Sequence, residues 1–209
     1  MGLFNLKKDK SLYLSEKDTV ILEKYIEDNI GHFNNVFHEI ASPDLHIDIA
    51  IIEPTEEKDY YTLVTMGMSA FKMPIPSNMG KANRAEMAIR LPKNWNIKSN
   101  DEQDYWPIRI IKDLARFPYY DNCFFADGHY IDWPNNFANT NFNAVLLSRF
   151  VKGNNCKFNN NDEMIIYNVI PLYDSEFKFL VENGASKFFD IADDTVINSE
   201  ININRNRII

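Results

Sequence analysis

The segment from Tyr60 to Trp95 constrains the fold most, because two strand-like runs in it flank a connection rich in Met and Pro. Over residues 84–91, apolar side chains at every second position alternate with Arg, Glu, Ala and Arg. Residues 45–52 repeat with the same period of two and place one Leu and three Ile on one face. Because successive side chains of a strand point to opposite sides, both runs predict strands of a sheet with one apolar and one polar face.

Helical spacing predicts two longer helices. Ser15, with Asp18 three residues later, resembles a capping box, and apolar residues then recur at helical spacing, which predicts a helix over residues 15–30. Residues 104–117 carry apolar side chains at steps of three and four, and Pro118 is predicted to stop this second helix. We expect the second helix to pack across the apolar face of the sheet.

The rest of the chain predicts further strands and two short helices around Asn-rich and Gly-containing turns. The predicted segments are hairpin strands at 123–126 and 129–131, apolar runs at 144–151 and 164–170, an exposed Asn-rich loop at 153–162, and helices at 176–182 and 185–192. Together with the strands before them, they predict an α+β fold: a mixed, largely antiparallel β-sheet with helices packed on one face.

Domain organisation is predicted from length and from the absence of a dividing linker. A 24.4 kDa chain of 209 residues is long enough to bury about 70% of its unfolded surface. No stretch rich in Gly, Ser or Pro divides it. Residues 1–192 are therefore predicted to form one domain that includes the N-terminal helix, and residues 193–209 a polar tail.

The charge balance favours a protein partner over a nucleic acid or a membrane. The chain has 22 basic and 30 acidic residues, a net charge of −8, which disfavours the phosphate backbone of a nucleic acid and an anionic lipid surface. Its first residues lack the apolar core of a secretory signal, and no apolar run approaches the ~20 residues of a membrane span. We therefore expect a cytoplasmic protein that binds another protein. If charge guides the encounter, this partner has a basic surface.

Motifs for cofactors or catalysis are absent from the sequence. The seven Gly are not spaced for a phosphate-binding loop, the four His form no close pair at metal-ligand spacing, and the two Cys suggest neither a disulfide scaffold nor a zinc site. Ser69 follows Gly67-Met68 as in a nucleophile elbow, but the second Gly of that motif is missing. The sequence predicts no cofactor, no metal and no catalytic residue.

One polar cluster nevertheless leaves two interpretations open. His46 and Asp48 lie on one face of a predicted strand, and Glu86 and His129 could join them from neighbouring elements. Such a group could hold a divalent metal or transfer protons in a metal-assisted enzyme. The alternative, which we favour, is a structural polar network in which Asp48 or Glu86 pairs with Arg84 or Arg90 across strands.

Met and aromatic residues suggest where a partner binds. Five of the seven Met lie within residues 66–87, and thioether side chains adapt to irregular surfaces. Because Pro residues stiffen the connection, Met73 and Met79 are predicted to contact the partner. Trp133 is predicted to be an exposed anchor, with His129 of the predicted hairpin beside it, since aromatic side chains bury much area with few rotatable bonds.

Several separate motifs resemble the suppressor of fused domain family, in particular its short bacterial members. The matching segments are HIDIAIIEPT, LVTMGMS, RAEMAIRLP, YWPIRIIKDLARFP, GHYI and VIPLYDSE. The resemblance extends from about Ile30 to about Ile191 and implies the α+β domain that these motifs build in the family. It also implies a protein that binds other proteins and is not an enzyme.

The family suggests two kinds of partner. Its two-domain animal member clamps a transcription-factor peptide as an added β-strand between its halves, and the present chain is too short for the second half. Short bacterial members resemble immunity proteins, which neutralise a cognate toxin by direct binding. We therefore favour an immunity protein that binds a toxin domain, with a metal-assisted enzyme and a regulatory adaptor for a transcription factor as alternatives.

Overall fold

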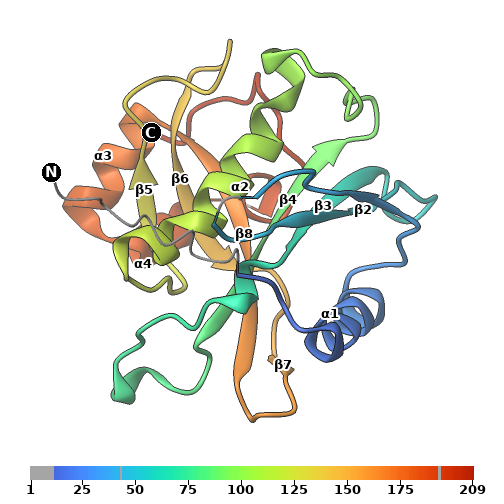
Figure 1. Cartoon of the computed structure of the whole chain (residues 1–209). Helices are drawn as coiled ribbons and strands as arrows, with labels where there is room; N and C mark the ends of the chain where they lie inside the picture. The colour runs from blue at the N-terminus through green and yellow to red at the C-terminus, as the bar shows by residue number, and fades with distance from the viewer. Residues whose placement is uncertain (1–11, 43, 193) are drawn as a thin grey trace, which may run out of the picture.

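An eight-stranded mixed sheet forms the centre of the structure, a computed structural model that describes residues 12–42, 44–192 and 194–209. The strand order is β1-β2-β3-β4-β8-β6-β5, with β7 paired to β8 outside this path (Figure 1). β4 and β8 run parallel, and the other paired strands are antiparallel. This confirms the α+β class and the mixed, largely antiparallel sheet. The strands are β1 (Asn35–Phe37), β2 (Asp48–Ile52), β3 (Tyr60–Met66), β4 (Arg84–Pro92), β5 (Tyr130–Asp132), β6 (Phe142–Arg149), β7 (Cys156–Lys157) and β8 (Glu163–Tyr173).

The two longer helices begin near their predicted starts. The Ser15 hydroxyl accepts a hydrogen bond from the backbone N–H of Asp18, as a helix N-cap does. The prediction that Pro118 stops the second helix was wrong, because that helix continues to Asp121. Proline in a last turn removes only one helical hydrogen bond, and its fixed φ fits the helix. The helices are α1 (Glu16–Asn29), α2 (Glu102–Asp121), α3 (Asp174–Asn183), α4 (Ala185–Ile191) and α5 (Asp194–Ile197), with 3-10 turns η1 (Met68–Ala70) and η2 (Ser77–Met79).

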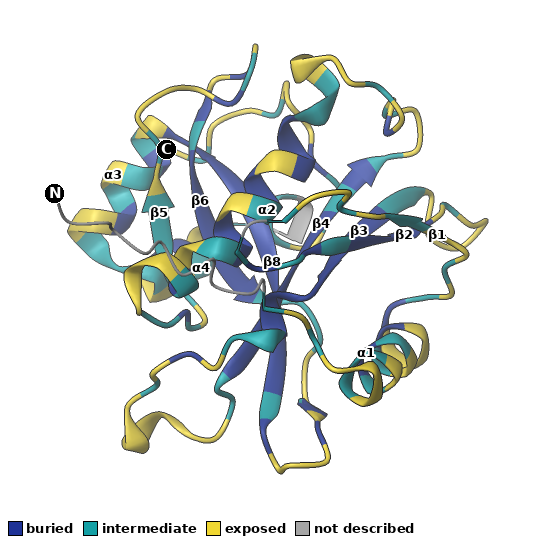
Figure 2. Cartoon of the chain, viewed as in Figure 1, coloured by how far each residue is buried: buried dark blue, intermediate teal, exposed yellow. Residues whose placement is uncertain are grey.

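Both faces of the sheet are covered, each by different helices. On one face, alternate strand residues such as Ile49, Leu63 and Ile89 pack with α2, as predicted. On the opposite face, Leu22 of α1 packs over β2 to β4, while Leu180 of α3 packs over β6 and β8 with α4. The helices thus lie on two faces rather than the one expected, and the central strands β4 and β8 are buried along most of their length (Figure 2). β8 carries apolar side chains on both faces, which is typical of a strand covered from both sides.

The predicted hairpin around Gly128 was wrong. Residues 123–126 form no strand, and β5 pairs with β6 instead. The Gly128 N–H donates to the carbonyl of Leu147, and the Leu147 N–H donates to the carbonyl of His129, each at 2.8 Å. The turn residues were correctly identified, but they lead into a strand whose partner lies farther along the chain.

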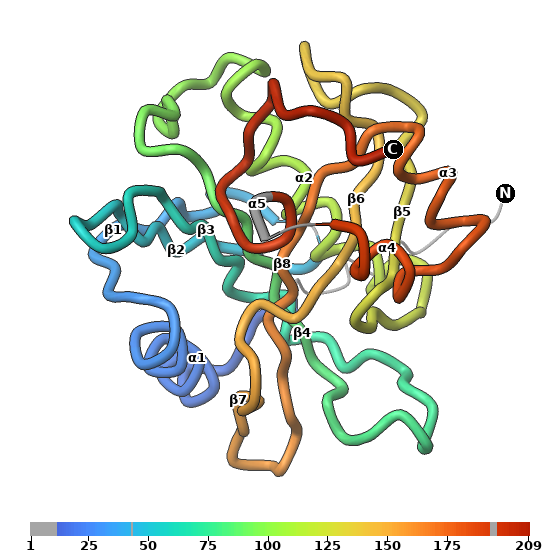
Figure 3. The backbone as a smooth tube through the Cα atoms, turned by 180° about the vertical axis from the view of Figure 1, so that it is seen from behind, coloured from blue at the N-terminus to red at the C-terminus, as the bar shows by residue number. Residues whose placement is uncertain are grey.

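The C-terminal segment, residues 196–209, returns across the domain, and we call it the strap (Figure 3). Ile201 donates its N–H to the carbonyl of Arg90 at 2.9 Å. Arg205 forms an ion pair with the fully buried carboxylate of Glu176, which also accepts the N–H of Ile208 at 3.0 Å. The polar tail is therefore fastened to the sheet and to α3. The division of the chain at residue 192 stays a prediction.

Helix length and hydropathy give one further result. Among the described residues, no helix is both long enough and apolar enough to cross a membrane.

Candidate protein-binding surface

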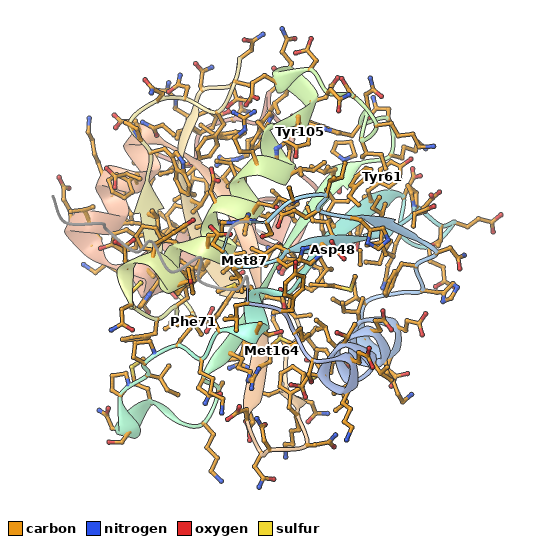
Figure 4. All side chains as sticks on the ribbon, viewed as in Figure 1. Asp48, Tyr61, Phe71, Met87, Tyr105 and Met164 are labelled. Carbon is orange, nitrogen blue, oxygen red and sulfur yellow. The ribbon has the colours of Figure 1, made fainter. Side chains whose placement is uncertain are left out.

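Two segments extend from the same end of the sheet, where β4 and β8 begin. We call residues 71–83 the Met loop and residues 156–164 the Asn hairpin. β4 and β8 run parallel with Arg84 opposite Met164, so the segments that precede these two strands lie side by side (Figures 1 and 3). Figure 4 marks Phe71, where the Met loop starts, and Met164, where the Asn hairpin ends. The strand order thus brings together two loops that are distant in sequence.

Asp162 connects the two loops at their bases. Its Oδ2 accepts hydrogen bonds from Nε and Nη2 of Arg84 at 2.9 and 2.8 Å, and the Lys72 ammonium lies 2.8 Å away. Its Oδ1 accepts from the side-chain amide of Asn83 at 3.1 Å. Burial alone would raise the pKa of Asp162, but the hydrogen bonds from Lys72, Asn83 and Arg84 and the charge of Arg84 hold that pKa well below its usual range. The Met loop and the Asn hairpin are therefore tied together by a charged network.

Glu86 organises the turn that leads into the Met loop. Its carboxylate is fully buried and accepts from the Thr65 hydroxyl at 2.6 Å, from the Gly67 N–H at 2.9 Å, and from the Ser69 N–H and hydroxyl at 3.0 and 2.6 Å. Burial raises the pKa of Glu86, and the hydrogen bonds from Ser69, Thr65 and Gly67 act in the opposite direction. We call this arrangement the Glu86 turn. It places polar groups on the predicted polar face of β4 but closes them off from water.

Gly67 is required in this turn for two reasons. Its φ of +136° lies in the region that favours glycine, and a Cβ there would lie 2.0 Å from the carbonyl oxygen of His46. The Glu86 turn is joined to the Asp162 network by Arg84, whose Nη1 donates to the carbonyl of Ser69 at 2.5 Å. One continuous polar network therefore runs from Glu86 to both loops.

The two predicted Met contacts have different environments. Met73 is only 3% exposed, packs in the core beneath α2, and accepts a hydrogen bond from the Phe125 N–H at 3.4 Å on its sulfur. The prediction that Met73 contacts a partner from a free surface is therefore contradicted, since Met73 anchors the loop from inside. Met79 is 48% exposed at η2 and remains available for contact.

The other predicted contacts, His129 and Trp133, flank the edge strand β5. β5 is at the end of the strand order, so by the alternation of antiparallel pairs the main-chain groups of Tyr130 and Asp132 point away from β6. The His129 ring lies 5.6 Å from Phe124, and burial lowers its pKa. Trp133 is half-buried rather than fully exposed, because its ring packs edge-on against Phe137 at 5.5 Å. No described strand pairs with the outer edge of β5, and each of the two residues presents part of its side chain beside that edge.

The structure does not assemble the predicted four-residue cluster. His46 Nε2 lies 3.1 Å from Asp48 Oδ1, while the second carboxylate oxygen of Asp48 (marked in Figure 4) lies 3.0 Å from Nδ1 of His38, a residue that the sequence analysis did not select. Glu86 accepts from hydroxyl and amide groups instead, and His129 contacts Phe124. No group of three or more His, Cys, Asp or Glu among the described residues could hold a metal ion.

The predicted cross-strand pairing of Asp48 or Glu86 with Arg84 or Arg90 was also wrong. The guanidinium of Arg90 lies over the rings of Phe150 and Tyr60. Arg84 pairs with Asp162 of the Asn hairpin, and neither Asp48 nor Glu86 is its partner. Sequence reasoning missed Asp162 and Ser69 as members of the network. Their only local signals are the turn-forming Asn residues before Asp162 and the Gly67 before η1, and neither signal names a partner 78 residues away in the chain.

Comparison with known proteins identifies the relatives of this chain. The family model described as "Suppressor of fused protein (SUFU)" matches residues 43–206. A relative from Ureaplasma parvum serovar 3, named "Uncharacterized protein UU111", is 27% identical over 188 residues, which cover 84% of this chain and 90% of the relative.

Solved structures of the same fold include a suppressor of fused homologue from Neisseria gonorrhoeae FA 1090, with a TM-score of 0.62, 17% identity, and coverage of 92% of this chain and 96% of that one. The protein in the Sufu-Fu complex has a TM-score of 0.65 and 10% identity, with 95% and 93% of the two chains covered. Drosophila Suppressor of Fused has a TM-score of 0.57 and 10% identity; the match covers 78% of this chain but only 43% of that longer one. At these identities the likeness concerns the fold.

Proposed function

The chain belongs to the suppressor of fused family, and on that basis we propose that it acts by binding another protein. One solved relative is named as a component of a complex, the Sufu-Fu complex. Because a shared fold alone does not transfer a partner, the proposal for this chain rests on its own surface.

The observation that carries the proposal is the ionic tie between the Met loop and the Asn hairpin. Asp162, Arg84 and Lys72 hold the bases of both loops together, and Met73 anchors the Met loop in the core. The loops are therefore organised before a partner arrives, which reduces the entropy lost on binding. Met79 then supplies an exposed, adaptable side chain for the contact.

We further propose that the partner is a toxin domain and that the chain is a cytoplasmic immunity protein. The net charge of −8 favours a partner with a basic surface, because opposite charges accelerate the encounter. His129 and Trp133 beside the edge of β5 are a second proposed contact region. A regulatory adaptor for a transcription factor would instead bind a peptide. The metal-assisted enzyme receives no support from the geometry, since Glu86 and His129 do not join His46 and Asp48.

The test begins with affinity capture of the tagged chain from its native lysate, with mass spectrometry of the bound proteins. We expect one folded partner at close to equal stoichiometry. Cells that produce this partner should stop growing, and co-expression of the chain should restore their growth. A short peptide segment as the binding unit would favour the adaptor, and a partner without toxicity would contradict the immunity role.

The captured partner then allows the surface to be tested with a matched pair of variants. Met79 and Val181 are both exposed apolar residues, 48% and 57% accessible, on the Met loop and on α3. We expect Met79→Glu to weaken binding by about tenfold, roughly the loss of one good interface contact, and Val181→Glu to leave it unchanged. Equal effects of the two variants, or a larger effect of Val181→Glu, would move the interface away from the Met loop.

A further inference from the structure

A small cavity lies between the sheet and the strap. Its volume is about 20 Å³, and we call it the strap cavity. An interior site needs roughly 10–15 Å³ to hold one water-sized species, so the strap cavity is large enough for one but not for a larger ligand. Its lining includes Arg90, Phe142, Asn168, Glu200, Asn202 and Arg205.

Arg90, which lines this cavity, carries buried hydrogen-bond donors. Its Nε and Nη1 are both buried and have no hydrogen-bond partner among the described residues. The guanidinium lies over the ring of Phe150 at 4.1 Å and near that of Tyr60 at 5.9 Å, contacts that hold the side chain in place but accept no conventional hydrogen bond on their faces. Burial lowers the pKa of Arg90, while the charge and the side-chain hydrogen bond of Tyr60 and the charge of Glu200 act to raise it.

Arg205, on the same cavity, provides the contrast. Its Nη1 and Nη2 donate to the two carboxylate oxygens of Glu176 at 2.5 and 2.6 Å, and Nη2 also donates to the carbonyl of Pro171 at 3.0 Å. The charge of Arg205 is thereby compensated inside the protein. A buried donor without an acceptor destabilises the folded state, and more so when the donor is charged. Two N–H donors of Arg90 therefore lack the protein acceptors that the donors of Arg205 have.

We infer that the strap cavity binds a single one-atom hydrogen-bond acceptor, a chloride ion or a water molecule, on the free N–H groups of Arg90. The strap forms one wall of the cavity, and the carbonyl of Arg90 itself accepts the N–H of Ile201 in the strap. Occupation of the site consequently stabilises the docked strap, because an acceptor held between them removes the cost of the free donors.

Crystals of the full-length chain grown in sodium bromide in place of sodium chloride test the inference directly. A peak of anomalous scattering next to Arg90 identifies a halide site, and a water-sized peak without anomalous signal identifies water; either result supports the inference. An ordered Arg90 beside an empty cavity, or an Arg90 side chain paired with Glu200, overturns it.

Thermal unfolding in sodium chloride and in sodium gluconate at equal ionic strength separates the two acceptors in solution. For chloride, we expect the wild-type midpoint to be about 2–4 °C higher in the chloride salt, as for a ligand that binds only the folded state. Arg90→Lys should abolish this difference, and Arg109→Lys, on the exposed side of α2, should keep it. Equal wild-type midpoints assign the site to water, provided that the crystals show the water peak.

Discussion

Glu86 and Asp162 are two buried carboxylates of one network, and their pKa values shift in opposite directions. Both are desolvated, and both accept several hydrogen bonds. The donors of Glu86 are the neutral hydroxyl and amide groups of the Glu86 turn, whereas Asp162 faces the cationic side chains of Arg84 and Lys72. Complete burial among neutral donors therefore raises the pKa of Glu86, whereas cationic donors lower the pKa of Asp162, which is less deeply buried.

The two sites also differ in what they hold together. Glu86 closes a turn of its neighbouring strand β3, so its hydrogen bonds belong to the interior of the domain. Asp162 joins two loops whose tips reach solvent, and Lys72 is itself half exposed. The Glu86 turn should therefore govern global stability, and Asp162 the position of the proposed binding surface. The following predictions test this difference.

The largest effect is expected from Glu86→Ala, which we predict to lower the free energy of unfolding by about 3–5 kcal/mol, because the change leaves several buried donors without an acceptor and opens a cavity. Urea unfolding followed by circular dichroism measures it. Glu182→Ala, at an exposed position of α3, is the control and should have little effect. A loss below about 1 kcal/mol would show that the turn does not depend on the carboxylate.

A slightly smaller effect is expected from Gly67→Ala, at about 3 kcal/mol, since the new Cβ meets the backbone of His46 and the residue also loses a favourable φ. Gly153→Ala is the matched control. Gly153 also has a positive φ, +102°, but nothing lies within 4 Å of its Cβ position, so only the backbone strain of about 1 kcal/mol is expected. If urea unfolding gave the same loss of unfolding free energy for Gly67→Ala and Gly153→Ala, the Glu86 turn would not be as tightly packed as described.

For Asp162→Asn we predict a loss of about 2–3 kcal/mol, because the buried guanidinium of Arg84 keeps a neutral acceptor but loses its counter-charge. Its distinctive result is local: amide hydrogen exchange should become faster across the Met loop and the Asn hairpin. Asp190→Asn, on the exposed surface of α4, should change neither the free energy of unfolding nor the amide exchange of the two loops. Unchanged amide exchange in the Met loop would show that Asp162 does not hold the proposed binding surface in place.

The smallest effects are expected in the pH dependence of stability, which depends on the difference between the folded and unfolded pKa values. Glu86 has a raised folded pKa, so its protonated form stabilises the fold below the unfolded pKa of about 4.3, and this contribution is lost as the pH rises through the folded pKa. The stability of wild type relative to Glu86→Gln should therefore increase as the pH falls through that window.

Asp162 should respond with the opposite sign. Its folded pKa is lowered, so its contribution is complete above the unfolded pKa of about 3.9 and is lost as the pH falls toward the folded pKa. The stability of wild type relative to Asp162→Asn should decrease below about pH 4. Unfolding curves at a series of pH values measure both differences in stability. If both differences changed in the same direction as the pH falls, the proposed distinction between the two carboxylates would be wrong.

The sequence by itself determined the main strands and the starts of the two longer helices, together with the apolar face that meets α2. The alternation of residues 84–91 predicted which side of β4 meets α2, and the Ser15 cap predicted the start of α1. These predictions succeed because they depend on local periodicity and on hydrogen bonds between neighbouring residues. The family motifs likewise predicted the α+β fold. Met79 is exposed, as a contact with a partner requires, and the contact itself stays a prediction.

Only the tertiary structure decided which polar groups meet. The parallel pairing of β4 with β8 brings Arg84 to Asp162, the return of the strap brings Arg205 to Glu176, and the core takes up Met73. Local pattern says which face a side chain lies on, but its partner across the sheet depends on the order in which distant strands pair. The same is true of the strap cavity, whose walls come from segments that no local signal connects.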